Sequence, residues 1–346
     1  MLSIRIFFLL AVLLLLTAFS NSGFKKNNME FSSRLATSVN ADFNKNNAEF
    51  IALLKDIRLN IVAPASGVSN ELLSDLQHIN SLNLNIPKNC FNEKNSLFHA
   101  NSDEIRYKCL EKALLDDGTK VIWALRGGYG SAKLIHNLQK LKKPAQEKFF
   151  IGFSDITALH IFLTQEWGWK TIHGNGIVEV FNKEKDRQNF IKIAKIISGK
   201  ETEATIQGLV PLNSEAKLSK LITGKLTGGN LTLVENSLAT EWQIKPLGKM
   251  LFLEDVGIKP YQLDRSLYHL KQAGIFNQVN AIIFGSCDND NQDIMNVLND
   301  FASHLKVPVF KTNRFGHERL NDPIIYNTIT KIIPSHNNQF DLIMKL

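Results

Sequence analysis

A serine that could act as a nucleophile stands in the run Gly152-Phe153-Ser154-Asp155. The run follows a continuous apolar stretch and precedes a helical apolar pattern from Ala158, which predicts a strand, a sharp turn and a helix. Such a turn lifts a serine hydroxyl clear of a sheet, although Ile156 stands where the nucleophile-elbow consensus has its second glycine. By local pattern alone, a serine here is more often a helix cap than a nucleophile.

A glycine-rich run, Arg126-Gly127-Gly128-Tyr129-Gly130-Ser131, follows the predicted strand Val121–Leu125. The carboxyl ends of parallel strands share one edge of a sheet, so backbone N–H groups of this run could hold an oxyanion beside Ser154. The run lacks the Walker signature and the third glycine of the dinucleotide fingerprint. Its spacing fits a plain tight turn equally well.

An acid and a base could complete the site. Glu254 ends an apolar strand pattern, and His317 lies in a loop after the predicted strand from Val307 to Lys311. A carboxylate at a strand end can face a site, and an imidazole titrates near neutral pH, which suits a general base. Helix capping for Glu254 and a structural role for His317 remain open, and His160 and His173 are other candidate bases. The residues alone therefore indicate a hydrolase-like α/β protein.

Six runs in one order resemble the LD-carboxypeptidase family of serine peptidases, which includes muramoyl-tetrapeptide carboxypeptidase and the microcin C self-immunity peptidase. The resemblance covers nearly all of the chain after residue 22, and it implies Ser154 as nucleophile, His317 as general base and Glu254 as the acid that orients the histidine. The six runs are Ile61–Ser66, Arg126–Ser131, Gly152–Leu159, Thr227–Leu231, Leu253–Val256 and Phe315–Glu318.

The same resemblance implies further roles around the triad. Backbone N–H groups of Gly128 and Asp155 would form the oxyanion hole, and Gly127, Tyr129 and Asn230 would contact the substrate. The implied chemistry needs no metal and no cofactor. Relatives are commonly dimers, so a homodimer is an expectation as well.

Alternating apolar runs and amphipathic segments predict an α/β fold. The resemblance implies a flavodoxin-like N-terminal domain with a parallel sheet that carries Ser154. It also implies a β-rich α/β C-terminal domain that carries Glu254 and His317, with the active site in the cleft between the two domains. The predicted ranges are 1–22 for a signal peptide or short membrane anchor, 23–50 for a linker, 51–200 for the N-terminal domain, 201–220 for an interdomain linker and 221–346 for the C-terminal domain.

The chain begins with a segment typical of export. Arg5 precedes an almost unbroken apolar run, Ile6–Ala18, with the length and flanks of a signal h-region. A bilayer span needs about 20 apolar residues, so a short uncleaved anchor is the alternative. Small residues at Ala18, Ser20 and Ser22 offer cleavage points. We expect a periplasmic protein, or one anchored facing the periplasm, although relatives usually work in the cytoplasm.

Charge and cysteine content limit the partners. The formal net charge is +7 and falls to +6 if the segment with Arg5 is removed. Lys and Arg are scattered, so we do not expect nucleic-acid binding; a mildly basic protein suits an anionic cell-wall polymer or membrane surface. Cys90, Cys109 and Cys287 form no C-x-x-C pair, which argues against a zinc site or redox motif. In an oxidising compartment Cys90 and Cys109 could pair.

The first function we expect is hydrolysis of the L,D peptide bond in peptidoglycan-derived tetrapeptides, with release of the terminal D-alanine. An alternative is amide cleavage of peptidyl-nucleotide toxins of the microcin C type. Another, from a different class, is a non-catalytic binder of cell-wall peptides that has kept the cleft.

Overall fold

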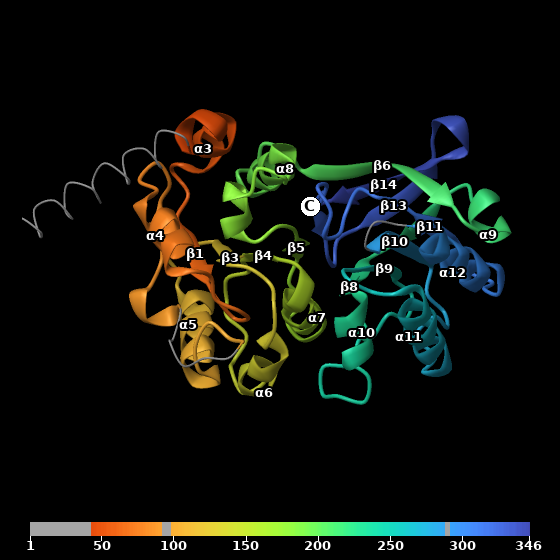
Figure 1. The fold of residues 1–346 in the computed structure, drawn as a ribbon, viewed down its shortest axis with the longest axis horizontal. Coiled ribbons are helices and arrows are strands. Elements are labelled where there is room, and N and C mark those ends of the chain that lie inside the picture. Colours follow the sequence, from red (N-terminus) through yellow and green to blue (C-terminus); the bar gives the residue numbers. More distant parts are fainter. Residues whose placement is uncertain (1–42, 92–97, 288–290) are drawn as a thin grey trace, which may run out of the picture.

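A computed structural model describes residues 43–91, 98–287 and 291–346. The predicted signal segment, 1–22, and most of the predicted linker 23–50 lie outside the described residues. Two sheets lie side by side, and the chain passes from the first to the second along strand β6 (Glu203–Pro211) (Figure 1). Within the described ranges, no helix is long and apolar enough to cross a membrane.

The first sheet has the strand order β12-β5-β4-β3-β1-β2. Strands β1 to β5 are parallel, and their order 2-1-3-4-5 is that of flavodoxin-like sheets. Strands β1 and β3 are buried along their whole length, as expected for parallel strands covered on both faces. The predicted α/β fold with a parallel N-terminal sheet is confirmed. The strands are β1 Leu59–Val62, β2 Leu84–Asn85, β3 Val121–Ala124, β4 Phe149–Gly152, β5 Thr171–His173 and β12 Ile324–Ile325.

Helices of the first half include several that follow these strands. Ser69 and Ser102 cap the first turns of α4 and α5 by accepting hydrogen bonds from backbone N–H groups. The helices are α3 Ala48–Leu54, α4 Asn70–His78, α5 Asp103–Leu115, α6 Ile135–Leu138, α7 Thr157–Glu166 and α8 Arg187–Ile197. The helix α3 begins inside the range predicted as a linker, 23–50, and packs against α8.

The second sheet has the order β7-β13-β14-β6-β11-β10-β9-β8. Strands β8 to β11 are parallel, and the other four add antiparallel pairs, which confirms a β-rich second half. Its other strands are β7 Ile222–Gly224, β8 Leu226–Asn230, β9 Met250–Asp255, β10 Ala281–Cys287, β11 Val309–Lys311, β13 Thr330–Pro334 and β14 Phe340–Lys345. Its helices are α9 Ser214–Lys217, α10 Leu231–Asn236, α11 Pro260–Gln272 and α12 Gln292–Ser303.

The predicted interdomain linker, 201–220, is wrong as a description of structure. It contains β6, which lies inside the second sheet between β11 and β14, and the short helix α9. Strand β6 buries Ala204, Ile206 and Leu209 on one face and exposes polar residues between them. Such alternation marks a half-buried strand, but the many polar residues led to the segment being interpreted as a connection.

The second half of the chain also contributes a strand to the first sheet. Strand β12, from the range predicted as the C-terminal domain, pairs antiparallel with β5 at the edge of the first sheet. The chain therefore crosses between the sheets more than once, and the second half is fastened to the first by backbone hydrogen bonds.

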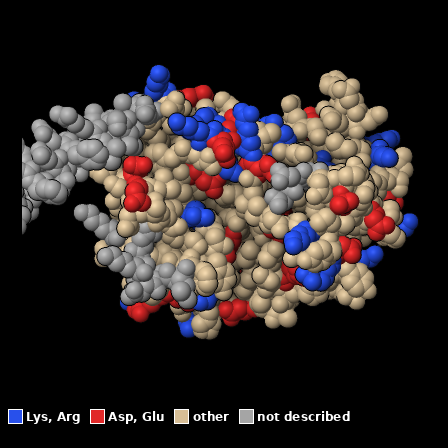
Figure 2. All heavy atoms as spheres, in the orientation of Figure 1, with Lys and Arg blue, Asp and Glu red and all other residues tan. Residues whose placement is uncertain are grey.

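Charge on the surface is mixed. On the face drawn in Figure 2, Lys and Arg side chains lie among Asp and Glu side chains. This view agrees with the scattered charges seen in the sequence.

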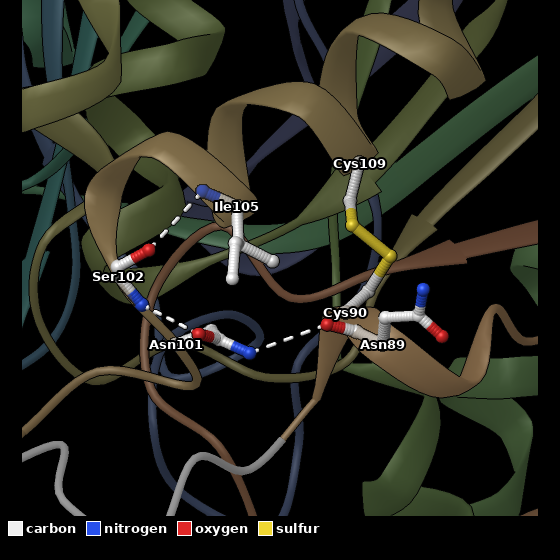
Figure 3. Close-up of a disulfide and its surroundings, with 6 residues drawn as sticks. All are labelled: Asn89, Cys90, Asn101, Ser102, Ile105 and Cys109. Carbon is white, nitrogen blue, oxygen red and sulfur yellow. Dashed lines mark hydrogen bonds between the residues drawn. A yellow bond between two sulfur atoms is a disulfide. The ribbon is translucent and has the colours of Figure 1, made fainter.

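A disulfide joins Cys90 to Cys109, with Cα atoms 5.9 Å apart (Figure 3). It links the segment after β2 to α5. Asn101 strengthens this link, because its Nδ2 donates to Asn89 O and its Oδ1 accepts the N–H of Ser102. The pairing considered from the sequence is thus present, and Cys287 is a buried thiol outside it.

This disulfide should stabilise the folded chain. It joins residues 19 positions apart, so loop-closure entropy predicts a loss of about 3 kcal/mol in unfolding free energy when it is removed. Urea unfolding of the Cys90→Ala/Cys109→Ala variant should show this loss, and a Cys287→Ala variant serves as the matched single-thiol control. Peptide mapping without reductant that found two free thiols at Cys90 and Cys109 would contradict the pairing.

Candidate active site

Ser154 lies at the turn between β4 and α7. Its φ of +61° is in the left-handed region, where a non-glycine residue carries backbone strain. A Cβ on Gly152 would stand 2.8 Å from Cγ2 of Ile156, so this glycine makes room for the isoleucine that departs from the elbow consensus. The strained turn is typical of a nucleophilic serine at the end of a strand.

The glycine run comes directly against this turn. A Cβ on Gly127 would stand 2.7 Å from Cβ of Ser154, and a Cβ on Gly128 would overlap Ser66 Oγ. Among the described residues, the backbone N–H groups of Gly128 and Asp155 have no hydrogen-bond acceptor. Unused N–H groups beside a serine are what an oxyanion hole requires.

The side chain of Asp155 fixes the glycine run to the serine turn. It is buried, and its Oδ2 accepts the N–H of Ser131, while Ser131 Oγ–H donates to Asp155 O. Burial raises the pKa of Asp155, and the hydrogen bonds from Ser131 oppose that shift. The side chain therefore has a positioning role, distinct from the backbone role expected for this residue.

The candidate acid and base come from the second half of the chain. His317 Nδ1 lies 2.7 Å from Oε2 of Glu254, whose side chain is fully buried at the end of β9. The ring of His317 lies 4.8 Å from the ring of Phe153, the residue before Ser154. Ser154 and His317 both line one cavity of about 470 Å³. The structure thus brings the three predicted triad residues to one site.

The electrostatics of the pair suit a base. Burial lowers the pKa of His317, but the charge and hydrogen bond of Glu254 outweigh it, and the net pKa lies above the usual 6.5. Burial raises the pKa of Glu254, while the charge and hydrogen bond of His317 leave it lowered overall. In the tautomer that suits this contact, Nδ1–H donates to the carboxylate and Nε2 can accept a proton.

Neither of the other candidate bases can serve. His160 is fully buried, with Nε2 at 2.8 Å from Gly152 O, and burial lowers its pKa to about 3. His173 is fully buried beside Asn321, and burial lowers its pKa to about 4. Both are structural histidines: His160 lies on α7 and His173 ends β5.

The loop that carries His317 is held by the first half of the chain. Lys185 Nζ donates to the carbonyls of His317 (2.6 Å) and Glu318 (2.8 Å). The N–H of Asp186 donates to Arg319 O, one residue further along. Sequence reasoning missed Lys185, because its partners lie more than 130 residues away and no local pattern marks such a contact.

A second missed residue is Arg106 of α5. Its guanidinium group is fully buried and donates to Gly130 O (3.0 Å) and to Pro64 O. It thereby fixes the glycine run to the segment after β1. The sequence offered no signal for this role, because an arginine in a helix is usually exposed and only the structure shows that Arg106 is buried.

The predicted substrate contacts divide. Gly127 lines the cavity, whereas Tyr129 is exposed outside its lining. Asn230 does not line this cavity and is only 3% exposed. Its Nδ2 donates to Asp255 Oδ1 (3.0 Å) and its Oδ1 caps α10 by accepting the N–H of Leu233. Asn230 therefore supports the carboxylate strand, and a contact with substrate stays a prediction.

Family models and known proteins match most of the chain. Family models of the LD-carboxypeptidase N-terminal and C-terminal domains match residues 59–174 and 223–332. A Rickettsia conorii protein named "Putative carboxypeptidase" is 58% identical over 84% of this chain and 92% of its own. The murein tetrapeptide carboxypeptidase of Pseudomonas aeruginosa is 27% identical over 77% of this chain and 90% of its own.

Solved structures share the fold. Muramoyltetrapeptide carboxypeptidase from Oxalobacter formigenes superposes with a TM-score of 0.69 at 24% identity, over 83% of this chain and 98% of that one. The wild-type microcin C7 self-immunity protein MccF gives 0.68 at 18% identity, over 84% and 97%. With both family models matched and a relative 58% identical along most of its length, this chain belongs to the LD-carboxypeptidase family.

Proposed function

We propose that this family member is a serine carboxypeptidase that hydrolyses the L,D peptide bond of peptidoglycan-derived tetrapeptides and releases the terminal D-alanine. The observation that carries the proposal is the strained Ser154 turn in one cavity with the His317–Glu254 pair. The names of the murein peptide carboxypeptidases among its relatives support the substrate class.

The geometry suggests the order of steps. His317 Nε2 takes the proton of Ser154 Oγ as the oxygen attacks the scissile carbonyl carbon. The N–H groups of Gly128 and Asp155 stabilise the oxyanion, and Glu254 stabilises the imidazolium. His317 then protonates the leaving amine of D-alanine, which leaves an acyl-enzyme. Water, deprotonated by His317, cleaves the ester, and the histidine returns the proton to the serine oxygen.

The two alternatives make different demands on these residues. A binder of cell-wall peptides needs neither a strained serine nor a buried carboxylate behind a histidine, so the site favours catalysis. Cleavage of a peptidyl-nucleotide would use the same triad. The likeness to MccF concerns the fold, and substrate assays separate the two reactions.

Loss of the nucleophile or base should abolish turnover. Ser154→Ala and His317→Ala should lower kcat by roughly 10⁴- to 10⁶-fold, and Glu254→Gln by less, because the remaining groups still bind and polarise the substrate. Mass spectrometry of a disaccharide-free muramyl tetrapeptide, for loss of one alanine, measures this. Ser303→Ala, an exposed serine at the end of α12, is the control. An active Ser154→Ala chain would exclude Ser154 as the nucleophile. A tetrapeptide left uncleaved by the wild-type chain would exclude this peptide as the substrate.

The activity should also report the state of His317. Its protonated form cannot accept the serine proton, so kcat/KM should fall at low pH with a midpoint above 6.5. Glu254→Gln removes the carboxylate that raises the pKa, so the midpoint should move to lower pH. The exposed Glu104→Gln should leave it in place. A midpoint unmoved by Glu254→Gln would mean that another group sets the pKa of the base.

We further propose that the N-terminal segment exports the protein. The apolar run of residues 6–18 and the Cys90–Cys109 disulfide support this independently, because disulfides persist in oxidising compartments. Residues 1–42 fused to a reporter that is active only outside the cytoplasm should give activity. Leu13→Arg/Leu14→Arg in the fusion should abolish it. An inactive wild-type fusion would place the enzyme in the cytoplasm, and the mass of the exported product shows whether cleavage occurs.

A further inference from the structure

A second carboxylate lies in the wall of the catalytic cavity. Glu179, on the short helix Ile177–Phe181 that follows β5, lines the same 470 Å³ space as Ser154 and His317. None of the catalytic steps uses it. Arg126 and Lys185 line the cavity as well, so its wall presents groups of both signs.

The environment of Glu179 leaves its charge incompletely compensated. Its side chain is 20% exposed, yet its Oε2 is buried and makes no hydrogen bond to any described residue. Glu179 forms an ion pair with Lys185, but the Lys185 Nζ lies 3.9 Å from Oε2, which is beyond hydrogen-bond distance. Lys185 directs its short hydrogen bonds to the carbonyls of His317 and Glu318 instead.

This arrangement costs free energy in the empty site. Burial raises the pKa of Glu179, against the opposing charges of Lys185, His317 and Arg126. A carboxylate largely removed from water is costly in free energy, and a cation that approaches the accessible part of this side chain from the cavity would offset that cost. The cavity opens to solvent beside the nucleophile, so the substrate is the group that can bring such a cation.

We propose that Glu179 binds an ammonium group on the substrate side chain next to the scissile bond, which makes it a specificity residue for substrates with a cationic side chain. The proposal rests on the serine carboxypeptidase function above. The α-amine of a tetrapeptide is a second source of an ammonium group, but it lies about 10 Å further along an extended chain. Because Glu179 lies in the same cavity as Ser154, it suits an ammonium group on the side chain next to the scissile bond better than the more distant α-amine.

The competing explanation is structural: Glu179 could serve only as counter-ion to Lys185 and so support the His317 loop. The two explanations differ in one measurable respect. A counter-ion affects all substrates alike, whereas a recognition group affects only those that carry the ammonium.

The test compares three tetrapeptides that end in D-alanine. Two are N-acetylated and carry lysine or its uncharged analogue norleucine before the D-alanine; the third carries norleucine and a free N-terminal amine. For the wild-type chain, kcat/KM should favour lysine over norleucine by about 10- to 100-fold, the size of a hydrogen-bonded charge pair. The free amine should give no such gain. Glu179→Gln keeps the shape of the side chain, and in this variant the lysine-to-norleucine ratio of kcat/KM should fall toward one. The matched control is Glu184→Gln, an exposed carboxylate further along the same segment, which should keep the ratio.

Each result decides something. A wild-type chain that cleaves both acetylated peptides equally, or a Glu179→Gln chain that keeps the preference, overturns the subsite and leaves the proposed function standing. A gain from the free amine instead of lysine overturns the side-chain assignment. Cleavage of none of the peptides overturns the proposed function; calorimetric binding to Ser154→Ala, with and without Glu179→Gln, then tests the subsite alone, and equal binding of the lysine and norleucine peptides, or none, overturns it.

Discussion

The catalytic site depends on one constraint: the loop that carries His317 must be held against a sheet to which it does not belong. Lys185 meets this constraint by donating to two consecutive carbonyls of the loop. Asp322, at the far end of the loop, forms ion pairs with Lys192 of α8 and with Arg314 of the loop itself. Strand β12 then continues the chain into the first sheet. Hydrogen bonds, ion pairs and sheet pairing therefore fix the histidine to the half of the chain that supplies the serine.

The same constraint explains why so many charges are buried near the site. A buried ion pair contributes little net stability, because desolvation offsets the attraction between its members. A buried ion pair instead fixes geometry, because each buried charged group has few possible hydrogen-bond partners. Oε2 of Glu254 contacts His317, and Oδ2 of Asp155 accepts the N–H of Ser131, so each carboxylate fixes one element of the site. Glu254 and Glu179 each have one buried oxygen without a hydrogen-bond partner among the described residues, Oε1 and Oε2 respectively, but Glu179 has no hydrogen bond comparable to the His317 contact of Glu254.

Sequence reasoning located the residues that the structure brings together at the candidate site because they sit in short motifs at strand ends. Ser154 and Glu254 follow buried apolar runs, and a chain's local pattern reports such positions well. It could not choose His317 over His160 and His173 without the resemblance, since the choice depends on burial. It misjudged β6, whose partners come from distant parts of the chain, and it gave no sign that the amide of Asn230 donates to Asp255. Contacts between remote segments are the part that a single sequence conceals.

Helix α5 connects the disulfide to the glycine run that would supply the proposed oxyanion hole. Cys109 anchors one face of this helix to Cys90, and Arg106, three residues earlier, donates to Gly130 O in the glycine run. The segment between the cysteines also reaches the run, because Phe98 O accepts the hydroxyl of Ser66, whose Oγ accepts the N–H of Tyr129. Constraining α5 by a covalent bond therefore limits the motion of the backbone N–H groups that face the serine. If the chain is exported as proposed, this bond would make the proposed oxyanion hole more rigid as well as stabilise the fold.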